Sequence, residues 1–301
     1  MTIYSLEGFS SRLTERLKML EPSLKDYNFR IDTIVKQNQP TYTGLICEQK
    51  DHNPGKYPIL DLDEMYEAYC EGTSIQEIAE YSLKLIHRVD KETPDKYEFL
   101  LDYEQCKGML YVQLMAKDNV MGEVPYQMLD DLAVVCYVHI DLGPDRYGRT
   151  AVNDSLIKLW GVSPKEVFDQ AFKNSPKIDP AVAVPMADIL PSGVPDELGM
   201  VILSNRQTRC GCGVICQQGF LDKVDKEFFD GKGMILIPES VDSFLALPLD
   251  IDIESEAIKA IIDHCNRGLD PSQVLSNHLY TYSKDLGFQS LENSGLDGFS
   301  R

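Results

Sequence analysis

The sequence contains none of the short motifs that most often identify an enzyme. It has no phosphate-binding loop, dinucleotide-binding glycine pattern, G-x-S-x-G nucleophile turn or H-E-x-x-H zinc motif. The C-x-x-C pairs of zinc knuckles are also missing, and no acidic cluster has the spacing of a calcium loop. We therefore predict no catalytic, cofactor-binding or metal-binding residues, and we do not expect an enzyme.

Long apolar stretches and an export signal are missing as well. The longest apolar-rich run, Leu132–Ile140, is too short to cross a bilayer and contains His139. The N-terminus does not show the basic and apolar segments of a signal peptide. Without export, the eight cysteines are expected to be reduced thiols. We therefore expect a cytoplasmic protein that does not bind membranes.

Basic residues are scarce relative to acidic ones. The chain has 29 Lys and Arg against 48 Asp and Glu, which gives a formal net charge of −19. Such a charge repels nucleic acid backbones, so we expect no direct binding of nucleic acid. It favours solubility and would attract a basic protein partner. With 301 residues, 43% of them hydrophobic, the chain is long enough for two domains.

Apolar periodicity predicts an N-terminal α+β domain at residues 1–118. Leu6–Leu20 carries one apolar stripe at helical spacing, and β-branched and aromatic residues within 28–48 predict a hairpin. Ser74 and Glu77 have the spacing of a capping box, which satisfies free amide groups at the start of a helix. The residues after this capping box carry an apolar stripe at helical spacing, which predicts that the helix packs against a core.

A second α+β domain is predicted at residues 119–301. We predict a helix at Phe99–Ala116, just before this boundary, and a buried strand at Leu132–Leu142 after it. Tyr147–Val152 is the expected partner of that strand. Gly161 and Ser163 predict the end of one helix and the start of the next.

The segment from Leu198 to Pro248 predicts a β-β-α-β-β arrangement among small mixed sheets with flanking helices. Five prolines make residues 176–197 a poor helix, so we expect a linker or a surface wrap there, and the Gly- and Ser-rich tail 286–301 is expected to be loose. The five predicted elements are Met200–Asn205, Gly211–Cys216, Phe220–Phe229, Gly233–Pro238 and Asp242–Leu247.

Three closely spaced cysteines are the most suggestive candidates for chemistry. On a strand, Cys210, Cys212 and Cys216 would share one face, and His264 or Cys265 as a fourth ligand would complete a zinc site. Buried cysteine also packs as a small apolar residue, and we favour that interpretation; whether the three thiols bind metal is left open. Cys136 and His139 would lie on opposite faces of their strand and would not form a catalytic pair.

Several segments, taken in order, resemble a family of uncharacterised clostridial and related Firmicute proteins whose domain has no known function. The resemblance covers nearly the whole chain and implies no activity, cofactor or site residue. At Cys212 and Cys216 the chain departs from the expected pattern, which further disfavours a metal site. The segments are Tyr57–Leu60, Met65–Tyr69, Asp131–Ala133, Leu159–Val162, Leu203–Asn205, Ile237–Ser240 and Val274–Ser276 with Tyr280 and Tyr282.

Three functional hypotheses follow from the sequence. The first is a non-enzymatic, acidic interaction or regulatory protein that binds a basic partner. The second is a hydrolase or thiol enzyme assembled from distant residues such as Cys136, His139 and Cys212; it requires a pocket in which a histidine contacts a cysteine, serine or carboxylate. The third is mimicry of nucleic acid by carboxylates that line one face. Partner identity and oligomeric state are left open.

Overall fold

The computed structural model describes residues 3–36, 39–49, 58–92, 97–143, 147–190, 198–251 and 255–291. Chain contacts divide the protein into an N-terminal unit, residues 1–36 and 40–100, and a C-terminal unit, residues 37–39 and 101–301. Both contain helices and small antiparallel sheets, which confirms the predicted α+β class. The division falls near residue 100, whereas the sequence places it near residue 118. Among the described residues, no helix combines the length and apolar character needed to cross a bilayer.

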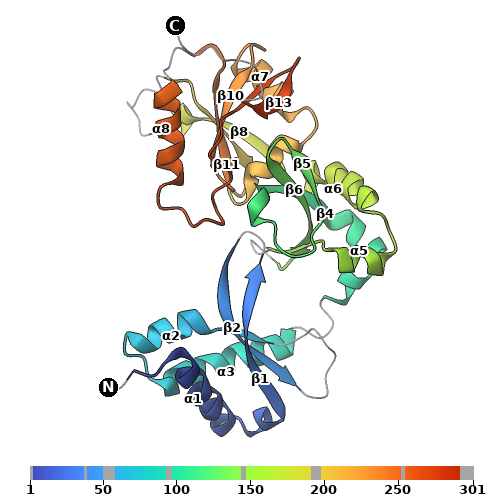
Figure 1. Ribbon diagram of the computed structural model, residues 1–301. Helices are drawn as coiled ribbons and strands as arrows, with labels where there is room; N and C mark the ends of the chain where they lie inside the picture. The colour runs from blue at the N-terminus through green and yellow to red at the C-terminus, as the bar shows by residue number, and fades with distance from the viewer. Residues whose placement is uncertain are drawn as a thin grey trace. The chain divides into compact units, whose positions relative to one another are not determined.

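The N-terminal unit packs three helices with a three-stranded sheet of order β1-β2-β3 (Figure 1). The predicted first helix and the hairpin are confirmed. Its elements are α1 (Leu6–Leu20), the 3-10 helix η1 (Pro22–Asp26), β1 (Tyr27–Lys36), β2 (Gln39–Gln49), β3 (Ile59–Asp61), α2 (Leu62–Cys70) and α3 (Ile75–Glu92).

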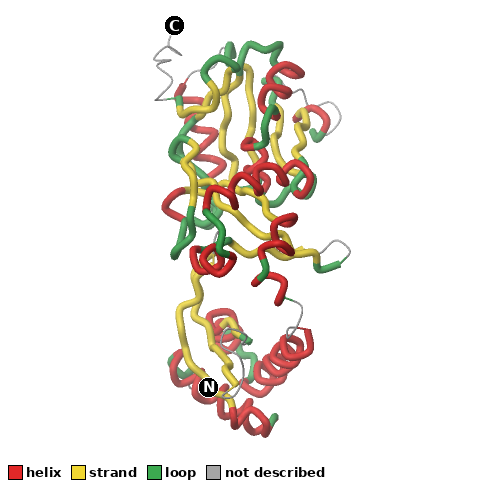
Figure 2. The backbone as a smooth tube through the Cα atoms, turned by 90° about the vertical axis from the view of Figure 1, so that its right-hand side faces the viewer, coloured by secondary structure: helices red, strands yellow, loops and turns green. Residues whose placement is uncertain are grey.

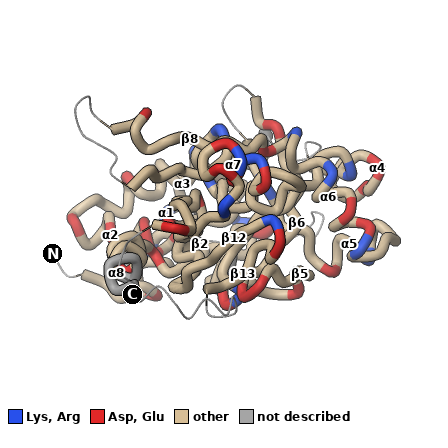
Figure 3. Tube along the Cα trace, turned by 90° about the horizontal axis from the view of Figure 1, so that it is seen from above, with Lys and Arg blue, Asp and Glu red and all other residues tan. Residues whose placement is uncertain are grey.

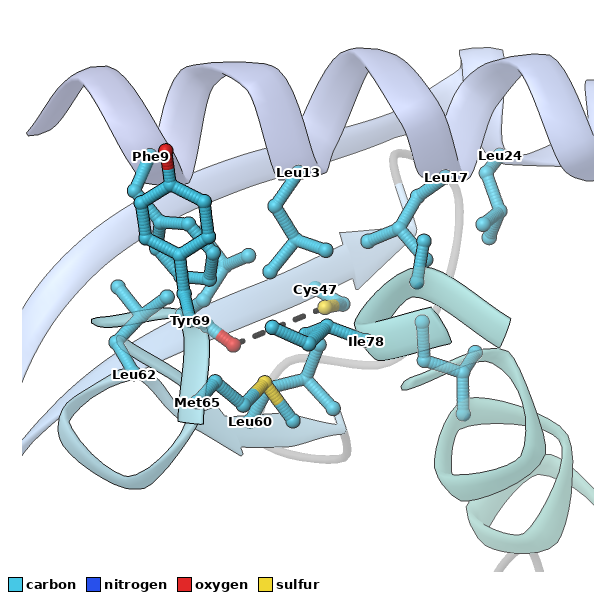
Figure 4. Packing of buried hydrophobic residues seen from close by; sticks show 13 residues of the cluster. Phe9, Leu13, Leu17, Leu24, Cys47, Leu60, Leu62, Met65, Tyr69 and Ile78 are labelled. Atoms are coloured by element: carbon cyan, nitrogen blue, oxygen red, sulfur yellow. Dashed lines mark hydrogen bonds between the residues drawn. The ribbon is translucent and has the colours of Figure 1, made fainter. Parts of the chain in front are cut away.

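One apolar core holds this unit together. Phe9, Leu13 and Leu17 on α1 point toward side chains from β3, α2 and α3, such as Met65 and Ile78 (Figure 4). In the same core, the Cys47 thiol donates a long hydrogen bond of 3.7 Å to the Leu45 carbonyl. Burying such side chains contributes roughly 1.5–3 kcal/mol each, and these contacts therefore stabilise the unit.

The predicted capping box of α3 is confirmed. The Glu77 amide donates to Ser74 Oγ at 3.2 Å, and the Ser74 amide donates to Glu77 Oε2 at 3.0 Å. These bonds lower the pKa of the Glu77 carboxyl, because they favour its charged form.

The C-terminal unit contains two sheets, and the 3-10 helix η2 (Glu98–Leu101) lies at the division between the units. Figure 2 shows the strands beside the helices that flank them. The elements are α4 (Tyr103–Cys106), η3 (Lys107–Met109), β4 (Leu110–Ala116), η4 (Lys117–Asn119), β5 (Tyr126–Leu129), β6 (Leu132–Asp141), β7 (Tyr147–Ala151), α5 (Asp154–Trp160), α6 (Pro164–Ile178), β8 (Ala181–Pro185), η5 (Met186–Asp188), β9 (Val201–Asn205), η6 (Gly211–Cys216), α7 (Phe220–Phe228), β10 (Met234–Ser240), β11 (Ser243–Pro248), α8 (Ser255–Asn266), β12 (Tyr280–Ser283) and β13 (Gly287–Ser290).

The smaller sheet is built around β6, which is buried along most of its length. β4 pairs with β6 along one edge, from Leu110 opposite Val138 to Ala116 opposite Leu132. β5 and β7 pair with successive parts of the other edge, so the predicted pairing of β6 with β7 is confirmed. The larger sheet has six strands in the order β13-β12-β10-β11-β9-β8.

Four of the five elements predicted between Leu198 and Pro248 are confirmed as β9, α7, β10 and β11, but the second, Gly211–Cys216, is not a strand. That segment is the 3-10 helix η6. A Cβ atom on Gly211 would lie 2.3 Å from Ser204 Oγ and 2.7 Å from the Asp242 carbonyl oxygen, so only glycine fits this close approach. The strand prediction was wrong because alternation of small residues does not distinguish a strand from a tight turn packed on its neighbours.

The helix predicted at Phe99–Ala116 is also wrong. This segment forms η2, α4 and η3, followed by strand β4. Six consecutive residues of β4 are buried, and a short, fully buried apolar run fits a helix or a strand equally well by periodicity.

The segments expected to be irregular are more ordered than predicted. Within 176–197, α6 continues through Pro176 to Ile178 and β8 follows, while 191–197 lie outside the described residues. In the tail 286–301, Gly287–Ser290 pairs with β12 as β13, and 292–301 lie outside the described residues. Strand pairing supplies the order here, because β8 and β13 are the two outer strands of the six-stranded sheet.

Candidate functional site

The turn between β5 and β6 connects the two sheets of the C-terminal unit. Asp130 adopts a left-handed conformation with φ 54°, which aspartate tolerates better than most residues. Its Oδ2 atom accepts a hydrogen bond of 2.7 Å from the Ser290 amide on β13. Asp131 accepts a bond of 2.7 Å from the Tyr280 hydroxyl on β12 and lies 2.9 Å from His278 Nδ1.

A cavity of about 570 Å³ lies beside this turn. Since an ionised carboxylate can only accept, a neutral His278 that bonds to Asp131 donates from Nδ1 and has Nε2 as an acceptor. A carboxylate that orients a histidine in this way is also found around general bases. The cavity is lined by Ala116, Lys117, Asp118, Asn119, Asp131, Asn266, Leu269, Pro271, Val274, Leu275, Ser276, Asn277 and His278.

A smaller and more apolar groove of about 320 Å³ follows strand β5. Met128 on β5 is 47% exposed and Tyr126 is 41% exposed, although both belong to a strand. Among the described strands, β5 pairs only with β6, so its outer edge is free. The groove is lined by Gln127, Met128, Leu129, Val134, Phe172, Ile215, Cys216, Gln217, Gln218, Gly219, Leu221, Tyr282 and Phe288.

Two carboxylates are close to residues that line the groove. Asp130 follows Leu129, and Asp222 follows Leu221 on α7. Asp222 is exposed and accepts a hydrogen bond of 2.7 Å from the Tyr282 hydroxyl. The groove therefore combines an apolar floor, a free strand edge and negative charge.

A second polar cluster lies where η6 packs on the smaller sheet. Arg149 on β7 donates to Gln113 Oε1 on β4, and its guanidinium lies 5.1 Å from the centre of the Tyr137 ring. Gln113 in turn donates to the Cys210 carbonyl at 3.3 Å. Burial raises the pKa of the Cys210 thiol, and the neighbouring Arg149 guanidinium offsets this only in part.

The same region buries a carboxyl group. Asp179 accepts a hydrogen bond of 2.7 Å from Asn205 Nδ2, and its backbone carbonyl accepts one of 2.6 Å from Gln217 Nε2. Burial raises the pKa of Asp179 to about 6, against the effect of the Asn205 bond and the nearby Arg149. These bonds join the ends of α6, β9 and η6.

The three cysteines singled out in the sequence do not share a strand face. Cys212 is fully buried and its thiol lies 3.4 Å from the Leu114 carbonyl, while Cys210 and Cys216 are partly buried. Burial raises the pKa of Cys216 to about 12 and that of Cys212 well above its ordinary value. Both thiols therefore stay protonated at neutral pH and are poor nucleophiles. No group of three or more His, Cys, Asp or Glu side chains in the described ranges is placed to hold a metal ion.

Asp61, Cys136 and His139 have local structural roles. Asp61 caps α2 by accepting from the Glu64 amide at 3.1 Å. Cys136 is buried within the smaller sheet, and His139 stacks on Tyr147 with ring centres 5.5 Å apart.

The sequence analysis did not identify His278, which is the only histidine lining the cavity beside Asp131 or the groove beside β5. The available signal was its spacing from Tyr280, because residues two apart in an extended segment face the same side. Their common partner, Asp131, is distant in sequence, and only the fold brings it near.

A family of unknown function, DUF5688, matches residues 6–284 of the chain. Searches among curated proteins and among solved structures gave no match.

Proposed function

We propose that this chain, which belongs to the DUF5688 family of unknown function, is a non-enzymatic interaction protein that binds an extended, basic segment of a protein partner. The observation that carries the proposal is the groove beside β5, where apolar side chains and a free strand edge occur together. An extended segment can add to such an edge through backbone hydrogen bonds and place alternate side chains in the groove.

The charge of the protein supports a basic partner. The net charge of −19 attracts positively charged segments and speeds their encounter with the surface. Asp222, which accepts a hydrogen bond from Tyr282 of the groove lining, and Asp130, which follows Leu129 of that lining, supply negative charge near the groove. Lys or Arg side chains at the ends of the bound segment would pair with these carboxylates, while β-branched residues would fill the apolar floor.

Selection from a random heptapeptide display library tests this proposal. The protein should enrich sequences that contain Lys or Arg together with β-branched residues. Met128→Lys should weaken binding of the enriched peptides at least tenfold, about 1.4 kcal/mol, because it removes apolar contact and repels the basic segment. Met19→Lys is the matched control, since Met19 is 72% exposed on α1 in the other unit. Enrichment of acidic peptides, or equal losses in both variants, would contradict the proposal.

The cavity at His278 supports a hydrolase as the second candidate. It holds a histidine within hydrogen-bond distance of a carboxylate, the arrangement that a general base requires. The residues lining it include no cysteine, and the Ser276 hydroxyl accepts a hydrogen bond of 2.9 Å from the His278 amide, so we infer that water activated by His278 is the nucleophile. Hydrolysis of an ester or phosphoester panel that disappears in His278→Ala would favour this candidate over the first.

Nucleic-acid mimicry has less support. On α6 and α7 of the C-terminal unit, Lys residues are interspersed with Asp and Glu (Figure 3), as where Lys165 lies 2.5 Å from Asp169 on α6. Mixed charges do not imitate a row of phosphates. We further propose a cytoplasmic location and a clostridial or related Firmicute origin, and cell fractionation of a native host would test the location.

A further inference from the structure

The outer edge of β1 in the N-terminal unit is unpaired among the described strands. β1 is the end strand of the order β1-β2-β3 and is ten residues long. Four consecutive residues at its centre, 30–33, are exposed, although Ile31 also borders a hollow that residues of α1 line. A long edge of this kind exposes unpaired backbone groups and readily pairs with another strand.

The side chains at this centre are complementary to themselves. If two copies of β1 pair antiparallel about Ile31, Ile31 meets Ile31, and each Arg30 lies directly opposite Asp32 of the other copy. Shifting the centre by one residue places Arg30 opposite Arg30, or Asp32 opposite Asp32. Like charges in directly opposed positions are destabilising, so only the pairing centred on Ile31 matches both charges.

Exposure of the central side chains fits this pairing. Ile31 is 45% exposed, and Arg30 and Asp32, which pair with each other along the strand, have side chains 46% and 51% exposed. Arg30 and Asp32 share the face opposite to Ile31. Association would cover Ile31 on one face and extend the network of charges on the other.

We infer that the protein forms a twofold-symmetric dimer in which two β1 edges join their three-stranded sheets into one continuous sheet of six strands. The partner is a second copy of this chain. Each copy contributes the same β1 edge to the interface, as expected for a twofold dimer. This inference is independent of the groove beside β5, which belongs to the other unit.

Charge reversal tests the inference with the full chain. Sedimentation equilibrium should give twice the mass of one chain for the wild type. Arg30→Asp places two carboxylates opposite each other, and Asp32→Arg places two guanidinium groups opposite each other. Each single variant should therefore raise the dimer dissociation constant about tenfold. The double variant, with both charges exchanged, should return within about threefold of the wild type.

Mixing the two single variants provides the sharpest control. The Arg30→Asp chain carries only negative charge at the two positions and the Asp32→Arg chain only positive charge, so the mixture should form a heterodimer although neither variant dimerises well alone. Circular dichroism would verify that each variant is folded. A monomeric wild type at all concentrations, or a mixture that associates no better than its components, would overturn the inference.

Discussion

The two units of this protein bury very different interiors. Among the described residues, the N-terminal unit buries two polar side chains, Ser10 and Ser82, within an apolar core. The C-terminal unit buries twelve: Gln113, Ser175, Asp179, Ser204, Asn205, Gln217, Asp225, Ser243, Ser272, Ser276, Thr281 and Ser290. The first unit is thus specified mainly by apolar periodicity, whereas the second also depends on hydrogen bonds between segments distant in sequence.

This contrast matters because the two kinds of interior respond differently to change. A buried apolar side chain loses packing when it is altered, and the loss is independent of pH. A buried carboxyl such as Asp179 adds a dependence on protonation. The single tryptophan, Trp160, lies in the C-terminal unit with its ring 5.6 Å from that of Tyr103, so its fluorescence reports on that unit alone.

The largest effect is expected for a charge placed in the apolar interior. Ile78 is 4% exposed, and Ile78→Asp should destabilise the N-terminal unit by about 4 kcal/mol, because it buries an unpaired carboxylate. In urea unfolding, the transition followed by the helical circular dichroism signal should move to a lower urea concentration. The midpoint of the transition followed by Trp160 fluorescence should not change. An equal shift in both signals would show that the units unfold as one.

A smaller, pH-dependent effect is expected at Asp179. Its pKa is raised from 3.8 to about 6 in the folded protein, so the folded state binds the proton more tightly than the unfolded state. The stability linked to this proton is fully present below about pH 4 and is lost as the pH rises through about 6, a change of roughly 2–3 kcal/mol.

Asp179→Asn should remove this part of the pH dependence, which urea unfolding followed by Trp160 fluorescence between about pH 4 and 7 would measure. The wild type should lose stability relative to the variant as the pH rises. Parallel stability curves for the two proteins would contradict the prediction.

The smallest effects are expected at two helix caps, one in each unit. Ser74→Ala and Ser163→Ala each remove a hydroxyl that accepts a bond of 3.2 Å from a helix amide, and each should cost about 1 kcal/mol. Ser163→Ala should shift the Trp160 transition, and Ser74→Ala should shift only the circular dichroism signal. Ser11→Ala, at an exposed position inside α1, is the control and should cost nothing. A loss in the control equal to those at the caps would refute the role of the hydroxyls.

The same contrast explains what the sequence could predict. The N-terminal helices, their capping box and the strand pair β6–β7 were predicted because periodicity and caps are local signals. The sequence did not predict that η6 is a 3-10 helix, because this depends on a close approach of Gly211 to Ser204. It also did not predict that β4 is a strand, because β4 is buried on both faces. The cavity at His278 was missed because its carboxylate comes from a turn far along the chain.

The turn at Asp130 and Asp131 has a mechanical consequence. It follows β5, the strand beside the groove. The Asp130 carboxyl group accepts a hydrogen bond from β13, and the Asp131 carboxyl group bonds to His278, which lines the cavity. A displacement of this turn by an occupant of the groove would move the carboxylate that holds His278 at the cavity. The two sites therefore share one structural support.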